Sequence, residues 1–251
     1  MIPSPDLGGE TVRTRPMRVA AVGDLHVMAS HTAPYREMFI QIGHEADVVC
    51  LCGDLTNHGR LDEAHVLAED LRACPIPVIA VLGNHDYECG QAEEVSRILR
   101  EAGARVLDGD AVEIAGVGFA GAKGFVGGFG RAMLSSFGED AIKTFVQASV
   151  DENLKLETAL RTLRTEKTVV VLHYSPIPET LVGEPEQIYC FLGSSRLAET
   201  VDRFEGVHTV LHGHAHRGSP EGRTPRGVTV RNVAQMVNRE AVGKPWIVFE
   251  V

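Results

Sequence analysis

The stretch PVIAVLGNHD (77–86) joins an apolar strand to a short polar turn. Its first residues are almost all apolar, as expected for a strand that is buried in a sheet. Gly83 permits a tight turn, and the polar residues Asn84, His85 and Asp86 follow it directly. In α/β proteins, ligand sites gather outside the carboxyl ends of the strands. The stretch therefore predicts a functional site at the edge of an α/β sheet.

Four more apolar strands end in polar residues in the same way. They are MRVAAVG (17–23) before Asp24-Leu25-His26, DVVCLCG (47–53) before Asp54 with Gly59 beyond it, TVVVLH (168–173) ending in His173, and HTVLHG (208–213) before His214-Ala215-His216. Because the strand ends share an edge of a sheet, residues that are distant in sequence can meet there. Carboxylate, imidazole and amide oxygen ligands suit Mn, Fe, Zn, Co or Ni rather than a thiolate site. The sequence therefore predicts a site for divalent metal ions.

The motifs occur in the order DxH, GDx4G, GNHD, a single His and GHxH. This order resembles the calcineurin-like metallophosphoesterase superfamily over about residues 17–234. The GNHD form and the compact length are most similar to bacterial members of the phosphodiesterase type. The resemblance implies an α/β fold, a four-layer αββα sandwich of two mixed β-sheets flanked by helices. It also implies a metal-dependent phosphoric ester hydrolase with two divalent ions, Mn²⁺ or Fe²⁺/Fe³⁺ first, with Zn²⁺, Co²⁺ or Ni²⁺ as alternatives.

The resemblance also implies how the ligands divide between the two ions. The first ion takes Asp24, His26, Asp54 and His216, and the second takes Asp54, Asn84, His173 and His214. Asp54 would bridge the pair. A hydroxide shared by the two ions would attack phosphorus in line. His85 would donate a proton to the leaving oxygen or stabilise its charge.

Asn57 and His58 mark a departure from the protein phosphatases of the superfamily, which carry Asp-Arg at this place. The Arg that would grip a dianionic monoester is absent here, and this favours a phosphodiester over a phosphomonoester substrate. Asn57 is a candidate to orient His85 through a hydrogen bond. His58 lies either near the substrate or in an ordinary loop. Asp86 is expected to support the ligands by hydrogen bonds, and Tyr174 is a further candidate near the substrate.

Apolar runs and segments with helical spacing alternate along the chain, as in an α/β protein. We predict strands at 17–23, 47–53, 77–83, 105–107, 168–173, 208–213, 227–234 and 246–251, a hairpin at 110–122, and helices at 34–43, 61–74, 91–102, 139–165 and 194–204. Residues 1–16 are predicted to form a flexible tail, and 17–251 a single domain. Two glycine- or proline-rich loops, 121–130 and 175–192, either overhang the metal site or are ordinary surface loops.

The composition narrows the range of partners. The net charge is −10, whereas a protein that holds a nucleic-acid backbone needs a basic face. No apolar run reaches the roughly 18 residues of a membrane span, and no secretory signal is visible. The five cysteines are an odd number, which fits a reducing compartment better than a disulfide framework. We expect a cytoplasmic enzyme acting on a small phosphate ester, without a membrane partner. A homo-oligomer is left open.

Two other functions stay open at this point. A nuclease of the recombination-repair type usually adds capping or DNA-binding segments, for which little chain remains here. A non-catalytic scaffold, such as the retromer subunit that shares this fold, has typically lost the catalytic histidine. His85 and all seven ligand positions are present in this chain, so hydrolysis of a phosphoester is the leading hypothesis. The residues alone do not identify the substrate or the native metal.

Overall fold

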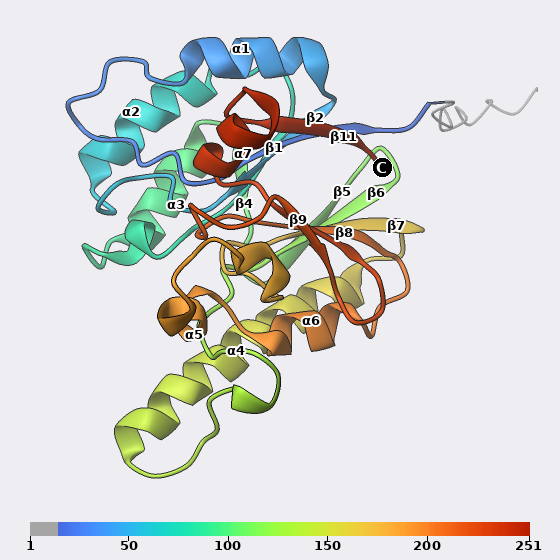
Figure 1. Ribbon diagram of the computed structural model, residues 1–251. Coiled ribbons are helices and arrows are strands. Elements are labelled where there is room, and N and C mark those ends of the chain that lie inside the picture. Colours follow the sequence, from blue (N-terminus) through green and yellow to red (C-terminus); the bar gives the residue numbers. More distant parts are fainter. Residues whose placement is uncertain (1–14) are drawn as a thin grey trace, which may run out of the picture.

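Short apolar runs form a first β-sheet of five strands in the computed structural model, which describes residues 15–251 (Figure 1). Across the sheet these are β11 (Ile247–Glu250), β1 (Arg18–Val22), β2 (Val48–Cys52), β3 (Val78–Val81) and β4 (Ala104–Val106). β1 to β4 run parallel, and β11 is antiparallel to β1. Every residue of β2 and β3 is buried. Their unbroken apolar sequence follows, since a parallel sheet is covered on both faces.

The second sheet has six strands and is also mixed. In order these are β5 (Asp110–Ile114), β6 (Val117–Gly121), β7 (Lys167–Val171), β8 (Val207–His212), β10 (Thr229–Asn232) and β9 (Glu221–Arg223). The four central strands run parallel, and β5 and β9 are antiparallel strands at the two edges. β5 and β6 form the hairpin predicted at 110–122.

Helices cover the outer face of each sheet (Figure 1). Those on the first sheet are α1 (Arg36–Glu45), α2 (Leu61–Leu71) and α3 (Ala92–Glu101), and those on the second are α4 (Asp140–Thr162) and α6 (Ser195–Val201). A separate apolar cluster, which includes Cys50, Ile79, Phe119 and Val169, fills the space between the sheets. Side chains alternate across a strand, so each sheet supplies one face to this cluster and one to its helices. The predicted four-layer αββα fold is confirmed.

Several short elements are absent from the sequence prediction. They are β9, α5 (Tyr189–Leu192), α7 (Gln235–Val242) and four 3-10 turns, η1 (His85–Tyr87), η2 (Gly130–Ala132), η3 (Glu179–Leu181) and η4 (Glu186–Ile188). Most have too few residues for a periodic pattern to stand out. Helix α4 ends at Thr162, three residues before the predicted end at 165.

Of the two alternatives left open for residues 121–130, an ordinary surface loop does not describe most of the segment. Ala122, Lys123 and Val126 are exposed by 0%, 9% and 6%. The backbone N–H of Gly127 donates to the carbonyl of Cys190, so this segment packs against the other glycine- and proline-rich loop. The glycines of this segment allow close packing, whereas the glycine-rich composition had suggested a flexible segment.

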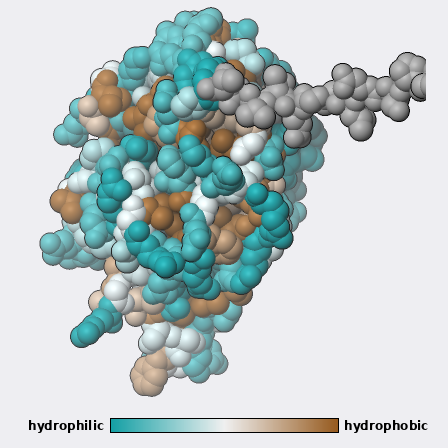
Figure 2. Space-filling model, turned by 90° about the vertical axis from the view of Figure 1, so that its right-hand side faces the viewer, coloured by the Kyte–Doolittle hydropathy of each residue, from teal (hydrophilic) through white to brown (hydrophobic). Residues whose placement is uncertain are grey.

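Residues 1–14, which make up nearly all of the predicted tail, lie outside the described residues. At the start of the described chain, Arg15 forms an ion pair with Asp47. Among residues 15–251, no helix is both long enough and apolar enough to cross a membrane. Hydrophilic residues cover most of the face seen in Figure 2, with smaller apolar patches between them.

Candidate metal centre

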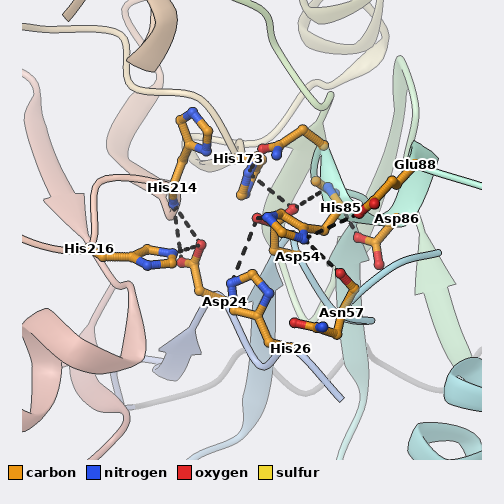
Figure 3. A network of polar contacts seen from close by, with 12 residues as sticks. Asp24, His26, Asp54, Asn57, His85, Asp86, Glu88, His173, His214 and His216 are labelled. Carbon is orange, nitrogen blue, oxygen red and sulfur yellow. Dashed lines mark hydrogen bonds and ion pairs between the residues drawn. The ribbon is translucent and has the colours of Figure 1, made fainter. Parts of the chain in front are cut away.

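The five motifs follow β1, β2, β3, β7 and β8, and the structure brings their side chains together at one edge of the two sheets (Figure 3). The first three strands belong to one sheet and the last two to the other. The carboxyl ends of both sets of parallel strands point to the same edge, where ligand sites form in α/β proteins. The site therefore draws on both sheets.

Asp24, His26 and His216 form the first group of ligand atoms, all within 4.8 Å of one another. His216 Nε2 lies 3.0 Å from Asp24 Oδ1. These are three of the four residues expected around the first ion. The fourth, Asp54, has its Oδ2 atom 3.9 Å from His26 Nε2.

Asp54, His173 and His214 form the second group, again within 4.8 Å. His173 Nε2 lies 3.4 Å from Asp54 Oδ1 and 2.9 Å from Asn84 Oδ1. The Asp54 carboxylate thus faces His26 with one oxygen and His173 with the other (Figure 3). This is the position that a shared ligand needs.

The backbone is unusual at four of these ligands. Asp24, His26, Asp54 and His214 have positive φ angles of 61°, 46°, 49° and 68°. Residues other than glycine rarely adopt this region, and strained residues that persist there cluster at functional sites. The sharp turns that follow the strands place these side chains in the cluster.

Gly83 makes room for the cluster. A Cβ atom added there would lie 2.2 Å from Asp54 Oδ1 and 2.8 Å from His173 Cε1. Only a residue without a side chain allows β3 to approach the two ligands this closely.

Burial favours the neutral form of three of the four histidines in the cluster. It lowers the pKa of His26 to about 4 and that of His214 to about 3, and it lowers the pKa of the fully buried His173 well below the ordinary value. His216 differs, because the hydrogen bond to Asp24 raises its pKa. Neutral imidazole is the form that binds metal ions, so three of the four histidines are ready to act as ligands at neutral pH.

The donor atoms fit a cation. Both ring nitrogens of His26 are buried and have no hydrogen-bond partner among residues 15–251. His173 Nδ1 lies 2.9 Å from the Cys52 carbonyl, and an Nδ1–H that donates there leaves Nε2 as an acceptor. Nε2 then faces the oxygens of Asn84 and Asp54, which are also acceptors. A cation satisfies such a cluster, whereas a hydrogen bond does not.

His85 lies beside the cluster and is accessible. Its Nδ1 is 2.7 Å from the Asn57 carbonyl, and its Nε2 is 4.0 Å from Asp54 Oδ2. The ring also meets that of His26 edge-on, with 4.6 Å between centroids. The side chain of His85 is 37% exposed, so a molecule in solution can reach it. Asn57 contacts His85 through its backbone carbonyl, where the sequence had suggested its side chain.

Asp86 points away from the ligand atoms into the protein. Its carboxylate accepts hydrogen bonds from the backbone N–H groups of Leu55, Thr56 and Gly83 and from the Thr56 hydroxyl. It therefore ties the loop after β2 to the loop after β3, the two loops that carry Asp54 and Asn84.

His58 and Tyr174 occupy different surroundings. The Nδ1 atom of His58 lies 3.0 Å from the buried carboxylate of Glu63, at the start of α2. Tyr174 is buried, and its ring contacts that of His214 at a tilt of 55°, with 4.5 Å between centroids.

Two further residues support the site, and one of them, Gln235, was missing from the sequence prediction. The backbone carbonyl of Phe191 lies 3.2 Å from His214 Nε2, so the loop 175–192 reaches the site. The Gln235 side-chain amide donates to the Asp24 carbonyl at 2.6 Å. Gln235 follows β10, and this position after a strand was the available signal.

Comparisons with known proteins agree with the geometry. A family model described as calcineurin-like phosphoesterase matches residues 17–218. The chain is 23% identical over 215 residues to a 3′,5′-cyclic-nucleotide phosphodiesterase of Nostoc sp., covering 80% of this chain and 72% of that protein. It is 22% identical over 223 residues to a probable glycerophosphodiester phosphodiesterase of Arcobacter nitrofigilis, covering 81% and 73%.

A solved structure supports the fold. The phosphopantetheinyl hydrolase of Mycobacterium tuberculosis superimposes with a TM-score of 0.65 at 13% identity, covering 94% of this chain and 96% of that one. At this identity the likeness concerns the fold alone. Together with the family match over most of its length, the convergence of the motifs at one sheet edge leads to the conclusion that the chain belongs to the calcineurin-like phosphoesterase family.

Proposed function

We propose that this protein is a phosphoesterase with two metal ions that hydrolyses a small phosphodiester. The observation that carries the proposal is the Asp54 carboxylate, which lies between two groups of candidate ligands. The first ion would be held by Asp24, His26, Asp54 and His216, and the second by Asp54, Asn84, His173 and His214. The named activities of the two curated relatives, both phosphodiesterases, support this choice of reaction.

Two divalent ions, when bound, would activate a water molecule and neutralise charge on the phosphoryl oxygens. Hydrogen bonds from neighbouring residues hold the candidate ligands in position. Asp86 fixes the loops of Asp54 and Asn84, and the Cys52 carbonyl fixes the ring of His173. Such supporting hydrogen bonds set the orientation of metal ligands. The set mixes carboxylate, imidazole and amide oxygen and contains no thiolate, which suits Mn, Fe, Zn, Co or Ni; among these, Mn²⁺ or Fe²⁺/Fe³⁺ is the occupant that the family resemblance favours.

His85 would donate a proton to the oxygen that leaves phosphorus. The Asn57 carbonyl accepts from Nδ1–H and so keeps Nε2 turned toward the Asp54 carboxylate. In the imidazolium form, Nε2–H would donate to the oxygen that leaves phosphorus.

A diester fits the charges around His85 better than a monoester. The loop after β2 has Asn57-His58 where the arginine would stand, its Arg60 is paired with Asp62, and His58 is turned to Glu63. A dianionic phosphate would therefore lack a strong extra cation at this place, while a diester carries only one negative charge.

The test of the function is hydrolysis by protein loaded with Mn²⁺ or Fe²⁺. Elemental analysis should give two ions per chain, and a panel of phosphodiesters and matched phosphomonoesters should show faster turnover of diesters. Absence of hydrolysis across the panel, with two ions bound, would refute the proposed activity. Faster hydrolysis of monoesters would refute the choice of diesters alone.

Replacing His85 separates binding from chemistry. We expect His85→Ala to keep both ions and to lose about 10²–10⁴-fold in turnover, the usual contribution of a positioned acid or base. The loss should be larger for esters with a poor leaving group than for nitrophenyl esters, which need little protonation. Equal losses for both would assign His85 to charge stabilisation, and loss of metal would assign it to the coordination shell.

A further inference from the structure

A cavity of about 440 Å³ lies next to the chain segments on either side of the GNHD motif. Its lining includes Leu82, Tyr87, Ser96, Arg100, Lys123 and Lys155. Leu82 and Tyr87 flank the GNHD motif on either side, and the Lys123 carbonyl accepts hydrogen bonds from the N–H groups of His173 and Tyr174. The cavity thus touches the segments that carry the ligands of the second ion. Its volume is within the range of small-molecule sites.

Lys123 is the unusual member of this lining. It is only 9% exposed, and its Nζ makes a single hydrogen bond, 2.8 Å to the Gly124 carbonyl. Glu152 and Asp108 attract this cation electrostatically, but no carboxylate of residues 15–251 makes a hydrogen bond or close ion pair with Nζ. A buried cation without a counter-ion is costly, and such groups are normally paired. The aromatic rings of Tyr87, Phe125 and Tyr174 lie 4.7–5.4 Å from Nζ and offset only part of this cost.

The other two cationic side chains of the lining, Lys155 and Arg100, already have partners, and Glu93 is a carboxylate of the same lining. Lys155 Nζ binds both Asp108 and Glu152, and Arg100 donates to the Val106 carbonyl. The second oxygen of Glu152 accepts from the Gly124 N–H rather than from Lys123. The Lys123 ammonium group has three N–H donors and uses one of them in a hydrogen bond within the described chain, and Lys123 belongs to the cavity lining. The Ser96 hydroxyl, which has no partner in the described chain, lines the same space.

We propose that this cavity binds a second anionic group of the substrate, a phosphate or a carboxylate, with Lys123 as its cation. This inference rests on the proposed phosphodiesterase activity and adds the class of substrate. A molecule whose scissile phosphodiester lies at the metal centre would reach Lys123 with an anion on its alcohol portion. Lys123 is then a specificity-determining residue, because its buried positive charge strengthens the binding only of substrates that carry a second anionic group.

Two matched pairs of substrates test the proposal and distinguish the two anions. Glycerophosphoserine differs from glycerophosphoethanolamine by one carboxylate, and glycerophosphoinositol 4-phosphate differs from glycerophosphoinositol by one phosphate. We expect the more anionic member of at least one pair to have a kcat/KM about 10- to 100-fold higher, the range of one charge-assisted hydrogen bond. The pair that shows the preference identifies the anion.

The Lys123→Met variant should remove most of this preference, mainly through KM, because methionine fills similar space without charge. The ratio within each pair is the readout, so a general loss of activity cancels. Lys143→Met is the matched control, since Lys143 is an exposed lysine of α4 that lies outside the cavity lining. Ala92→Phe, at the rim formed by the first residue of α3, should narrow the cavity and lower the same ratio without altering Lys123.

Equal kcat/KM values within both pairs would overturn the inference while leaving the phosphodiesterase activity intact. An unchanged ratio in both Lys123→Met and Ala92→Phe would also overturn it. Absence of hydrolysis of all four esters, together with nitrophenyl diesters, would instead count against the proposed function itself.

Discussion

Gly83→Ala tests whether the close approach of β3 to the ligands is required. The added Cβ would lie 2.2 Å from the backbone N and Oδ1 of Asp54 and 2.8 Å from His173 Cε1. An ordinary van der Waals contact begins at 3.4 Å, so Asp54 must move by more than about 1 Å for the methyl group to fit. A displacement of this size at a catalytic site typically costs about 10²-fold in rate. Overpacking should also cost about 1–3 kcal/mol of unfolding free energy.

The measurements are metal content after dialysis, turnover of a nitrophenyl diester, and urea unfolding of the metal-free protein. We expect Gly83→Ala to lose at least one ion and about 10²-fold or more in turnover. Gly206→Ala is the matched control, because a Cβ there meets its nearest neighbour at an ordinary 3.4 Å and should change stability by less than about 0.5 kcal/mol. Gly83→Ala protein with two ions and near-normal turnover would refute the reasoning.

Two further substitutions test Asp54 as the shared ligand and the pH dependence caused by the buried His212. Asp54→Asn should weaken binding of both ions and abolish hydrolysis with the fold largely intact, as judged by metal analysis and circular dichroism; near-normal turnover with two ions would exclude Asp54 as the bridge. His212 is fully buried, and burial lowers its pKa to about 4 from 6.5, so its stabilising contribution is complete above pH 6.5 and is lost as the pH falls toward 4. Between pH 6.5 and pH 4, the unfolding free energy of the metal-free protein should therefore fall by up to about 3 kcal/mol more with His212 than in the His212→Gln variant. Parallel curves of unfolding free energy against pH for the two proteins would contradict this.

The fold and the ligand cluster were predictable because each motif combines two kinds of information. An apolar run such as 77–83 identifies a buried strand, and the polar residues after it identify the carboxyl end. Parallel strands place these ends together, so the ligands converge without any knowledge of the distances between them. Asp86 was expected to support the candidate ligands and not to bind metal itself, and its hydrogen bonds to Leu55, Thr56 and Gly83 agree with this expectation.

What the sequence could not supply is contact made by the backbone. The carbonyl oxygens of Asn57, Cys52 and Phe191 reach His85, His173 and His214 respectively. A backbone carbonyl has the same chemistry in every residue, so the residue type does not predict these contacts. The packing of residues 121–128 was missed for a related reason. Glycine signals conformational freedom, and only the tertiary structure decides whether that freedom is used for mobility or for close packing.

The cluster of candidate ligands is costly to assemble in the folded protein, and bound ions would offset part of this cost. Four candidate ligands, Asp24, His26, Asp54 and His214, have positive φ, at a cost of about 1–3 kcal/mol each. Both nitrogens of His26 are buried without hydrogen bonds, which adds the cost of unpaired polar groups. Because the unfolded chain offers no such preformed cluster, ions that bind the folded state stabilise it by mass action. We therefore expect the protein's unfolding temperature to rise with the concentration of the metal ion.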